Sequence, residues 1–198
     1  MPTIRITPPA AEPVTLAEAR SQCRIAADDT SEDALLGVYI QAAREAAEHQ
    51  LGRSIINTTW EQSLDGFPSD SGAIELEQAL AAGITSVVYT NTAGSPVTMD
   101  TSGYQLQVAG QSASLLPAAG TSWPSTLTGD NVINTVRIRY VCGYGASAAA
   151  APAGIRQWLL LTVGALYANR EAVDSTGRVA ALPERFVDRL LDAERVYG

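Results

Sequence analysis

The chain has 198 residues and none of them is lysine, so its 13 basic side chains are all arginines. Lysine is the residue that forms Schiff bases and completes the phosphate-binding loop of nucleotide hydrolases. Histidine is scarce too: His49 stands alone and cannot build a two-histidine metal site within one chain. Its place near the end of a predicted helix favours a capping or surface role. These absences argue against an enzyme and predict no cofactor and no bound metal.

Cysteine is equally rare. Cys23 and Cys142 are too few and too far apart for a metal site or a disulfide framework, and both lie in apolar patterns. We therefore expect two buried free thiols. The chain opens without the basic and apolar leader of a secretory precursor. The apolar segment 155–167 is shorter than the roughly 20 residues that span a bilayer, so no membrane role is expected.

Acidic residues outnumber basic ones by 21 to 13, which gives a net charge of −8. Binding to nucleic acid requires basic side chains that neutralise phosphates, so this balance argues against a specific DNA-binding surface. The acidic excess lies in residues 1–151, whereas residues 152–198 carry six acids and six arginines.

The segment 152–172 carries the strongest structural signal. Pro152 suits the start of a helix, where no N–H is needed. Apolar residues then recur at helical spacing and also fill most of the opposite side. A helix that is apolar almost all round must be surrounded by protein. The pattern predicts a core helix with no catalytic group on it.

Residues 13–52 predict a pair of helices. A capping box formed by Thr15 and Glu18 precedes a short helix to about residue 24. A second helix follows, with Thr30 or Ser31 as its cap and Gly52 as the left-handed residue that ends it. Its solvent face is predicted to hold Gly37, Gln41, Arg44, Glu45 and Glu48. Its buried face is predicted to hold Leu35, Leu36, Tyr39, Ile40, Ala42, Ala43, Ala46, Ala47 and Leu51.

Residues 53–145 change from a period of 3.6 to a period of 2, which is typical of half-buried strands. Strands are predicted at 56–64, 73–77, 84–90, 104–108, 112–116 and 132–142, with a loop at 118–130. Short strands separated by turn residues indicate a small antiparallel sheet or sandwich. The predicted fold class is α+β: helices at 13–52 and 152–198 form one bundle, and a β-rich region is inserted between them.

Several acidic and basic groups are candidate sites. Glu75 and Glu77 project from one strand face, as the carboxylates of a carbohydrate-active enzyme do, but a solvated strand face explains them equally well. The acids Asp28, Asp29, Glu32 and Asp33 lack the spacing and central glycine of a calcium loop, which leaves helix capping. Arg137 and Arg139 alternate on one strand, where a solvated or inter-subunit face is the simpler interpretation than phosphate binding.

Five stretches, in order along the chain, resemble the head–tail connector (adaptor) proteins of long-tailed phages and gene transfer agents. They are 13–20 with Arg24-Ile25; 43–46 with 52–55; 59–61 with 64–68; 155–157 through 167–172; and Leu182-Pro183 with Leu190-Leu191. The chain departs from the family at Cys23, where relatives carry an aliphatic residue. It also departs at 77–83, which replaces a proline-rich segment.

The resemblance implies a structural subunit of the neck of a virion or phage-like particle, assembled in the bacterial cytoplasm. Twelve copies form a ring beneath the portal protein, extend the DNA channel, and dock a stopper or tail-completion protein. DNA passes through without specific binding, and an acidic lining keeps it mobile. Two alternatives stay open: a tail or baseplate adhesion module built on the β-rich region, and an enzyme that uses Glu75 and Glu77.

The resemblance also implies that the C-terminal part contacts the portal. A final helix is predicted from about Pro183, with an apolar stripe and arginines that suit acidic groups on a neighbour. The expected portal-binding residues are Arg178, Arg185, Phe186, Arg189, Leu190, Leu191 and Arg195. The alternative is that this helix packs back on the helices of its own chain.

Overall fold

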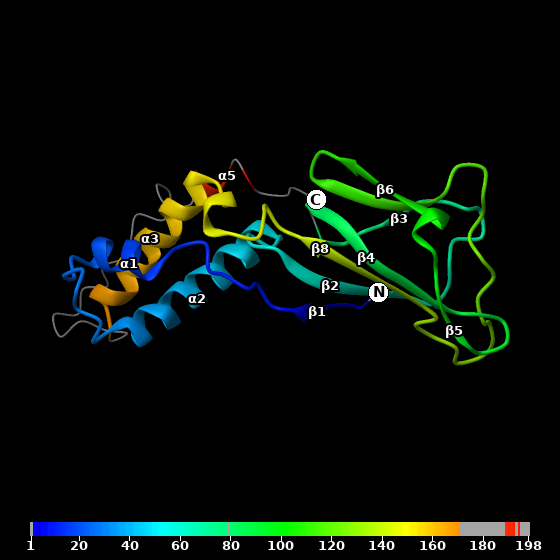
Figure 1. Ribbon diagram of the computed structural model, residues 1–198, viewed down its shortest axis with the longest axis horizontal. Coiled ribbons are helices and arrows are strands. Elements are labelled where there is room, and N and C mark those ends of the chain that lie inside the picture. The colour runs from blue at the N-terminus through cyan, green and yellow to red at the C-terminus, as the bar shows by residue number, and fades with distance from the viewer. Residues whose placement is uncertain (1, 79, 171–188, 193, 195–198) are drawn as a thin grey trace. The chain divides into compact units, whose positions relative to one another are not determined.

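The computed structural model describes residues 2–78, 80–170, 189–192 and 194 (Figure 1). The chain divides into two compact units. The β unit comprises Met1–Pro9 and Asn57–Gly143, and the helical unit comprises Ala10–Ile56 and Tyr144–Gly198. Helices and antiparallel sheets together make the fold α+β, as the sequence predicted. None of the described helices is long and apolar enough to cross a membrane.

The helical unit is built from segments at both ends of the chain. Its described elements are α1 (Leu16–Cys23), α2 (Asp33–Leu51), the 3₁₀ turn η2 (Ala148–Ala150), α3 (Ala153–Ala168) and α5 (Arg189–Asp192). Helix α1 begins at the predicted capping box: the Thr15 hydroxyl accepts the Glu18 N–H, and the Glu18 carboxylate accepts the Thr15 N–H. Helix α2 ends at Gly52 with φ +66°, the left-handed value that was expected.

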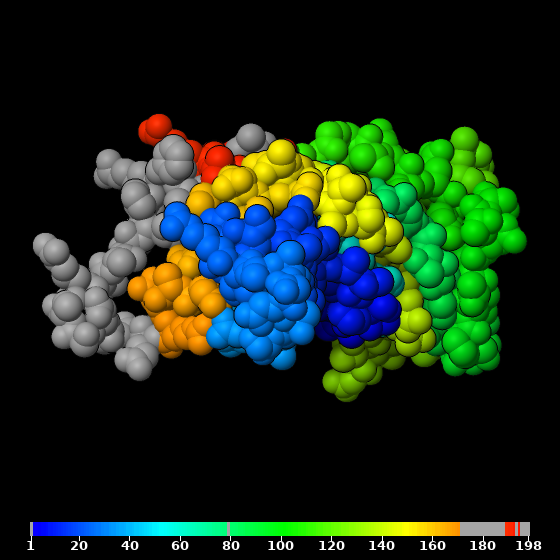
Figure 2. Space-filling view, turned by 60° about the vertical axis from the view of Figure 1, so that its left-hand side comes forward, coloured from blue at the N-terminus to red at the C-terminus, as the bar shows by residue number. Residues whose placement is uncertain are grey.

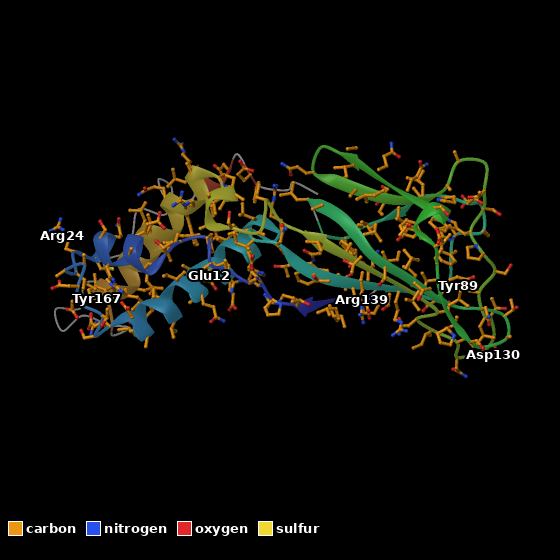
Figure 3. All side chains as sticks on the ribbon, in the orientation of Figure 1. Glu12, Arg24, Tyr89, Asp130, Arg139 and Tyr167 are labelled. Carbon is orange, nitrogen blue, oxygen red and sulfur yellow. The ribbon has the colours of Figure 1, made fainter. Side chains whose placement is uncertain are left out.

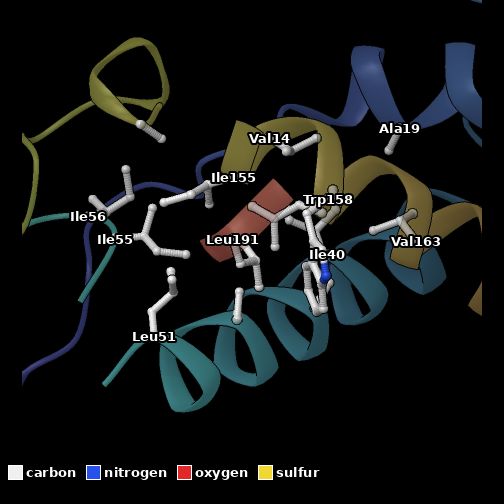
Figure 4. Close-up of a cluster of buried hydrophobic side chains, with 14 of the residues drawn as sticks. Val14, Ala19, Ile40, Leu51, Ile55, Ile56, Ile155, Trp158, Val163 and Leu191 are labelled. Carbon is white, nitrogen blue, oxygen red and sulfur yellow. The ribbon is translucent and has the colours of Figure 1, made fainter. Parts of the chain in front are cut away.

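Apolar side chains from all of these helices meet in one core (Figure 4). Helix α3 packs against α1, α2 and α5, and contributes Ile155, Trp158, Leu159 and Val163, each at most 5% exposed. Helix α2 contributes Leu36, Ile40 and the small Ala43 and Ala47, which let α3 approach closely. The apolar surface of α3 is thus covered along this stripe, while Leu166, on the same stripe near the C-terminal end of the helix, is 36% exposed.

Ala42 and Ala46, which were expected on the buried face of α2, are exposed. Two further details of α2 also differ from expectation. The N-cap is Glu32, without a side-chain cap, and not Thr30 or Ser31. The second difference is Arg44, which was expected on the solvent face but is only 3% exposed. Its guanidinium Nε donates to Glu12 at 2.8 Å and its Nη1 donates to Glu48 at 2.9 Å. A buried cation is tolerated when it is paired in this way, and Glu12 comes from outside the helix, where helical periodicity gives no sign of it.

Within the β unit, five strands form one antiparallel sheet in the order β1-β2-β8-β4-β5. These strands are β1 (Thr3–Thr7), β2 (Thr58–Leu64), β4 (Ala81–Thr90), β5 (Pro96–Thr98) and β8 (Val136–Cys142). A second sheet has the order β3-β7-β6, made of β3 (Ile74–Glu75), β6 (Tyr104–Ala109) and β7 (Ser112–Pro117), with the 3₁₀ turn η1 (Thr101–Gly103) before β6. All six predicted strands are present.

Strand alternation places the second core between these elements. In β8 the residues Val136, Ile138, Tyr140 and Cys142 are fully buried, whereas Arg137 and Arg139 face solvent. Their neighbours in the core include Leu64, Val87, Leu115 and Trp123. The Trp123 ring stacks on Phe67 at 4.8 Å, and its Nε1 donates to the Gly72 carbonyl at 2.9 Å. Trp123 therefore anchors the predicted loop 118–130 to the core.

Strands β1 and β5 were not predicted; they are edge strands of five and three residues with little alternation of buried and exposed side chains. The strand predicted at 132–142 is β8, which begins only at Val136. Asn131 and Asn134 adopt left-handed backbone angles of +63° and +54°, which a strand cannot accommodate. The strand predicted at 73–77 is shorter than expected, because only Ile74–Glu75 form β3.

Replacing Trp158 by alanine is expected to destabilise the helical unit by about 3–5 kcal/mol, the usual cost of truncating a large core aromatic. Leu166→Ala, at a residue of the same helix that is 36% exposed, is the control and should cost less. Urea denaturation of the full chain, followed by circular dichroism at the helical minimum, measures both. Equal effects of the two changes would mean that Trp158 is not a core residue.

Candidate functional site

Asp29 and Asp33, in the acidic segment between α1 and α2, form hydrogen bonds with other side chains of the protein. The Asp29 carboxylate accepts the N–H and hydroxyl of Ser31, and Asp33 accepts two hydrogen bonds from Arg20, at 2.7 and 2.5 Å. These hydrogen bonds lower the pKa of both carboxyls. Asp28 lies exposed beside them. Within the described ranges, no three side chains of the His, Cys, Asp and Glu types gather as a metal site.

Glu32 contacts the end of α3, where Tyr167 is labelled in Figure 3. Its carboxylate accepts hydrogen bonds from the Tyr167 hydroxyl and, at 2.6 Å, from Arg170. The Arg170 guanidinium also lies over the Tyr167 ring, 4.7 Å from its centre. The hydrogen bond from Tyr167, then that from Arg170, lowers the pKa of Glu32. These contacts attach the C-terminal end of α3 to Glu32, at the start of α2.

Glu75 and Glu77 are placed by a structural clamp. The buried Gln62 side chain donates to the Glu75 carbonyl at 2.9 Å and accepts the Glu77 N–H at 3.0 Å, so it joins the segment 75–77 to β2. The Glu77 carboxylate accepts a hydrogen bond from the Thr3 hydroxyl. Both glutamates are exposed. The geometry places both glutamates on a solvated face, which is one of the two interpretations that the sequence left open.

Arg137 and Arg139 do share the outer face of β8. Arg139 donates through Nε to Glu61 at 2.5 Å, directly across the strand pair with β2. Arg137 is exposed beside it. Arg139 is therefore neutralised within the sheet, which does not favour phosphate binding by this pair.

The two cysteines are free thiols. Cys142 is fully buried, and burial raises its pKa to about 12. Cys23 is only half-buried, so it departs from the expectation of a buried thiol, and burial again raises its pKa. His49 is exposed in the last turn of α2, where a surface role was expected.

The expected portal-binding residues are described only in part. Arg178, Arg185, Phe186 and Arg195 lie outside the described residues. In α5, Arg189 is exposed, Leu190 is half-buried, and Leu191 is fully buried in the helical core. A Cβ on Gly154 of α3 would meet the Leu190 carbonyl oxygen at 2.9 Å, so glycine at this position lets α5 approach α3.

Arg53, Tyr144 and Glu194 form a polar cluster next to α5. The Tyr144 hydroxyl donates to Glu194 at 2.5 Å and accepts from the buried Arg53 at 3.0 Å. Burial, followed by the hydrogen bond to Glu194, raises the pKa of Tyr144. The sequence gives no direct sign of this cluster, because its three residues are far apart along the chain. The Gly-Tyr-Gly motif at 143–145 and the isolated Gly154 were the available signals.

Comparison with known proteins gives the family. The sequence profile of the phage gp6-like head–tail connector proteins matches residues 13–117, which is more than half of the chain. The chain belongs to this head–tail connector family. A search of curated protein sequences found no significant match.

Solved structures resemble the connector over its whole length. One is described as the neck of an empty gene transfer agent (GTA) particle computed with C6 symmetry; it is 25% identical, with a TM-score of 0.77, and covers 100% of this chain and 97% of that chain. A chain from the virion of a native GTA particle has the same identity and coverages and a TM-score of 0.78. A third, from the neck of a native GTA particle computed with C12 symmetry, is 22% identical at a TM-score of 0.71 and the same coverages, and shows the fold alone.

Replacing Leu191 by alanine is expected to destabilise the connector by about 2–5 kcal/mol, as for other fully buried leucines. Arg189→Ala, one exposed residue of the same short helix, is the control and should change stability little. Urea denaturation of the full chain distinguishes them. A Leu191→Ala protein as stable as Arg189→Ala would show that α5 does not belong to the helical core.

Acid should destabilise the helical unit. Hydrogen bonds from Thr15, with the charge of Arg156, lower the pKa of Glu18 below its ordinary 4.5. The unfolded chain therefore takes up this proton first, so the contribution to stability is present above pH 4.5 and is lost as the pH falls through the lower folded value. Glu32 and Asp33 add to the loss in the same direction.

Glu18→Gln should make the stability of the helical unit less dependent on pH between 7 and 3, because it removes one of the titrating groups. Asp28→Asn, at an exposed carboxylate of the same unit, is the matched control. Denaturation midpoints at both pH values measure the effect. A midpoint difference equal to that of the wild type would contradict the assignment of Glu18.

Proposed function

We propose that the connector is a structural subunit that joins the portal to the next tail component at the neck of a phage or gene transfer agent particle. The observation that carries this proposal is the fold match over 100% of the chain to a neck protein at 25% identity. Family membership supports it independently. The role is mechanical, and the connector is not an enzyme.

In this proposal twelve copies form a ring that extends the DNA channel, and helices from both ends of each chain act as one bundle within it. A relative's neck was computed with sixfold symmetry, which supports a ring. A net charge of −8 per copy suits a channel, because like charge keeps the DNA from adhering to the wall. The particle neck is the proposed location, with assembly in the bacterial cytoplasm.

The proposed partners are the portal on one side and a stopper or tail-completion protein on the other. We keep the C-terminal residues Arg178, Arg185, Phe186, Arg189, Leu190, Leu191 and Arg195 as the proposed portal contact. The burial of Leu191 sets a condition on this contact. Either Arg189 and the other arginines bind while α5 stays on its own core, or α5 must leave that core.

Loss of the connector should give DNA-filled or emptied heads without tails, and a plasmid copy should restore tailed particles. Arg189→Glu should weaken binding to the purified portal by about tenfold, because it reverses an exposed charge in the proposed contact. Arg137→Glu, an exposed arginine of the β unit, is the control. Electron microscopy of particles and surface plasmon resonance measure the two effects. Tailed particles in the absence of the connector would contradict the proposed function.

A further inference from the structure

The open edges of the two sheets point to a contact between copies. An edge strand presents unpaired N–H and C=O groups that invite pairing with another chain. The edges here are β1 and β5 in one sheet and β3 and β6 in the other. Strand β3 has two residues, and β5 has three and begins at Pro96. Short strands and proline protect an edge, so the longer edge strands, β1 with five residues and β6 with six, are left.

Strand β6 has none of the usual protective features. Its sequence, Tyr-Gln-Leu-Gln-Val-Ala, carries no charge and no proline, and it pairs with β7 in unbroken register. The pair Ala109–Ser112 closes the hairpin turn, so the backbone groups of Tyr104, Leu106 and Val108 point to the open side. Ala113 of β7 lies opposite Val108, and its carbonyl accepts the Leu76 N–H on the side away from β6. Val108 and Ala113 are therefore a pair without mutual hydrogen bonds, as this register requires.

Exposed apolar side chains gather on the same two edges. The large hydrophobic side chains exposed in the described part of the β unit are Ile4 at 52%, Ile6 at 39%, Val108 at 53% and Ile133 at 66%. Three of these four belong to β1 or β6. Figure 2 shows the N-terminal residues, in dark blue, at the surface. Scattered single exposures need no explanation, but their concentration on two open edges does.

Charge favours the same edges as a contact between copies. Two copies, each with a net charge of −8, repel one another, so a stable contact has to avoid acidic groups. Neither β1 nor β6 contains any of the 21 acidic residues, and Arg5 is the single charged residue in the two strands.

We propose that β6 of one copy pairs edge to edge with β1 of the next copy, which joins neighbouring β units by a continuous sheet. The inference rests on the proposed ring, because a ring needs two different surfaces that fit each other. Pairing of β6 with β6 would give a closed dimer instead. Main-chain hydrogen bonds supply the attachment, and Val108 packs against the isoleucines of β1.

Cross-linking of assembled particles tests the pairing. Particles are produced with Ile4→Cys/Val108→Cys as the sole copy of the connector and treated with a short thiol–thiol cross-linker, which tolerates a difference of one residue in register. The double variant should give a ladder of covalent oligomers on denaturing gels. All variants carry Cys23→Ser, because Cys23 is half-buried whereas Cys142 is buried, and each single variant should give only the monomer band.

A ladder from Val108→Cys alone, or monomers alone from particles that carry a neck, would overturn the pairing and leave the connector role intact. Particles in which the connector is absent from the neck would instead overturn the proposed function.

A charge on the edge provides a second measurement. Val108→Asp should reduce the yield of tailed particles at least about tenfold, because it brings an acid into the contact. Ile133→Asp, at an even more exposed apolar residue away from the edges, should leave the yield unchanged. Both proteins should keep the circular dichroism spectrum of the wild type. Equal yields for the two variants would contradict the proposal.

Discussion

The helical unit depends on the burial of α3, whose apolar side chains no single segment of the chain can cover. Cover comes from α1 and α2, more than 100 residues earlier in the sequence, and from Leu191 of α5. This constraint brings the chain segments on both sides of residues 57–143 into one unit. The β unit can therefore fold around a separate core of its own, centred on Tyr140, Ile138 and Leu115, while the helical core remains closed.

Arginine takes the place of lysine throughout, and the paired guanidiniums show why that matters. Arg20 binds Asp33 through two nitrogens, Arg44 contacts Glu12 and Glu48, and Arg170 joins Glu32 while lying on Tyr167. A planar group with five donors can hold two elements at a defined angle, which a single ammonium does less well. These pairs link helix ends and loops in an otherwise acidic chain. In the described part of the chain, these paired arginines hold the fold together.

The sequence predicted what periodicity and local chemistry determine. Capping by Thr15 and Glu18, the end of α2 at Gly52, the core stripe of α3 and six strands all follow from local patterns. Burial of Arg44 could not be predicted, because its partner Glu12 lies 32 residues away on another segment. The same reason hid the Arg53–Tyr144–Glu194 cluster. Edge strands β1 and β5 were missed because a strand exposed on most sides has little alternation to detect.

Helix α5 is given two roles that can conflict: Leu191 stabilises the helical core, and Arg189 is proposed to bind the portal. Leu191 fills the helical core, and Glu194 hydrogen-bonds to Tyr144, so the end of the chain contributes to folding. Residues on the same short helix are proposed to reach the portal. Both roles are compatible if α5 presents Arg189 outward while Leu191 faces inward, since positions two apart on a helix point to different sides. Gly154 permits the close approach of α5 to α3 that such an arrangement requires. A contact made in this way needs no unfolding of the subunit, and its strength then depends on exposed arginines instead of on released apolar surface.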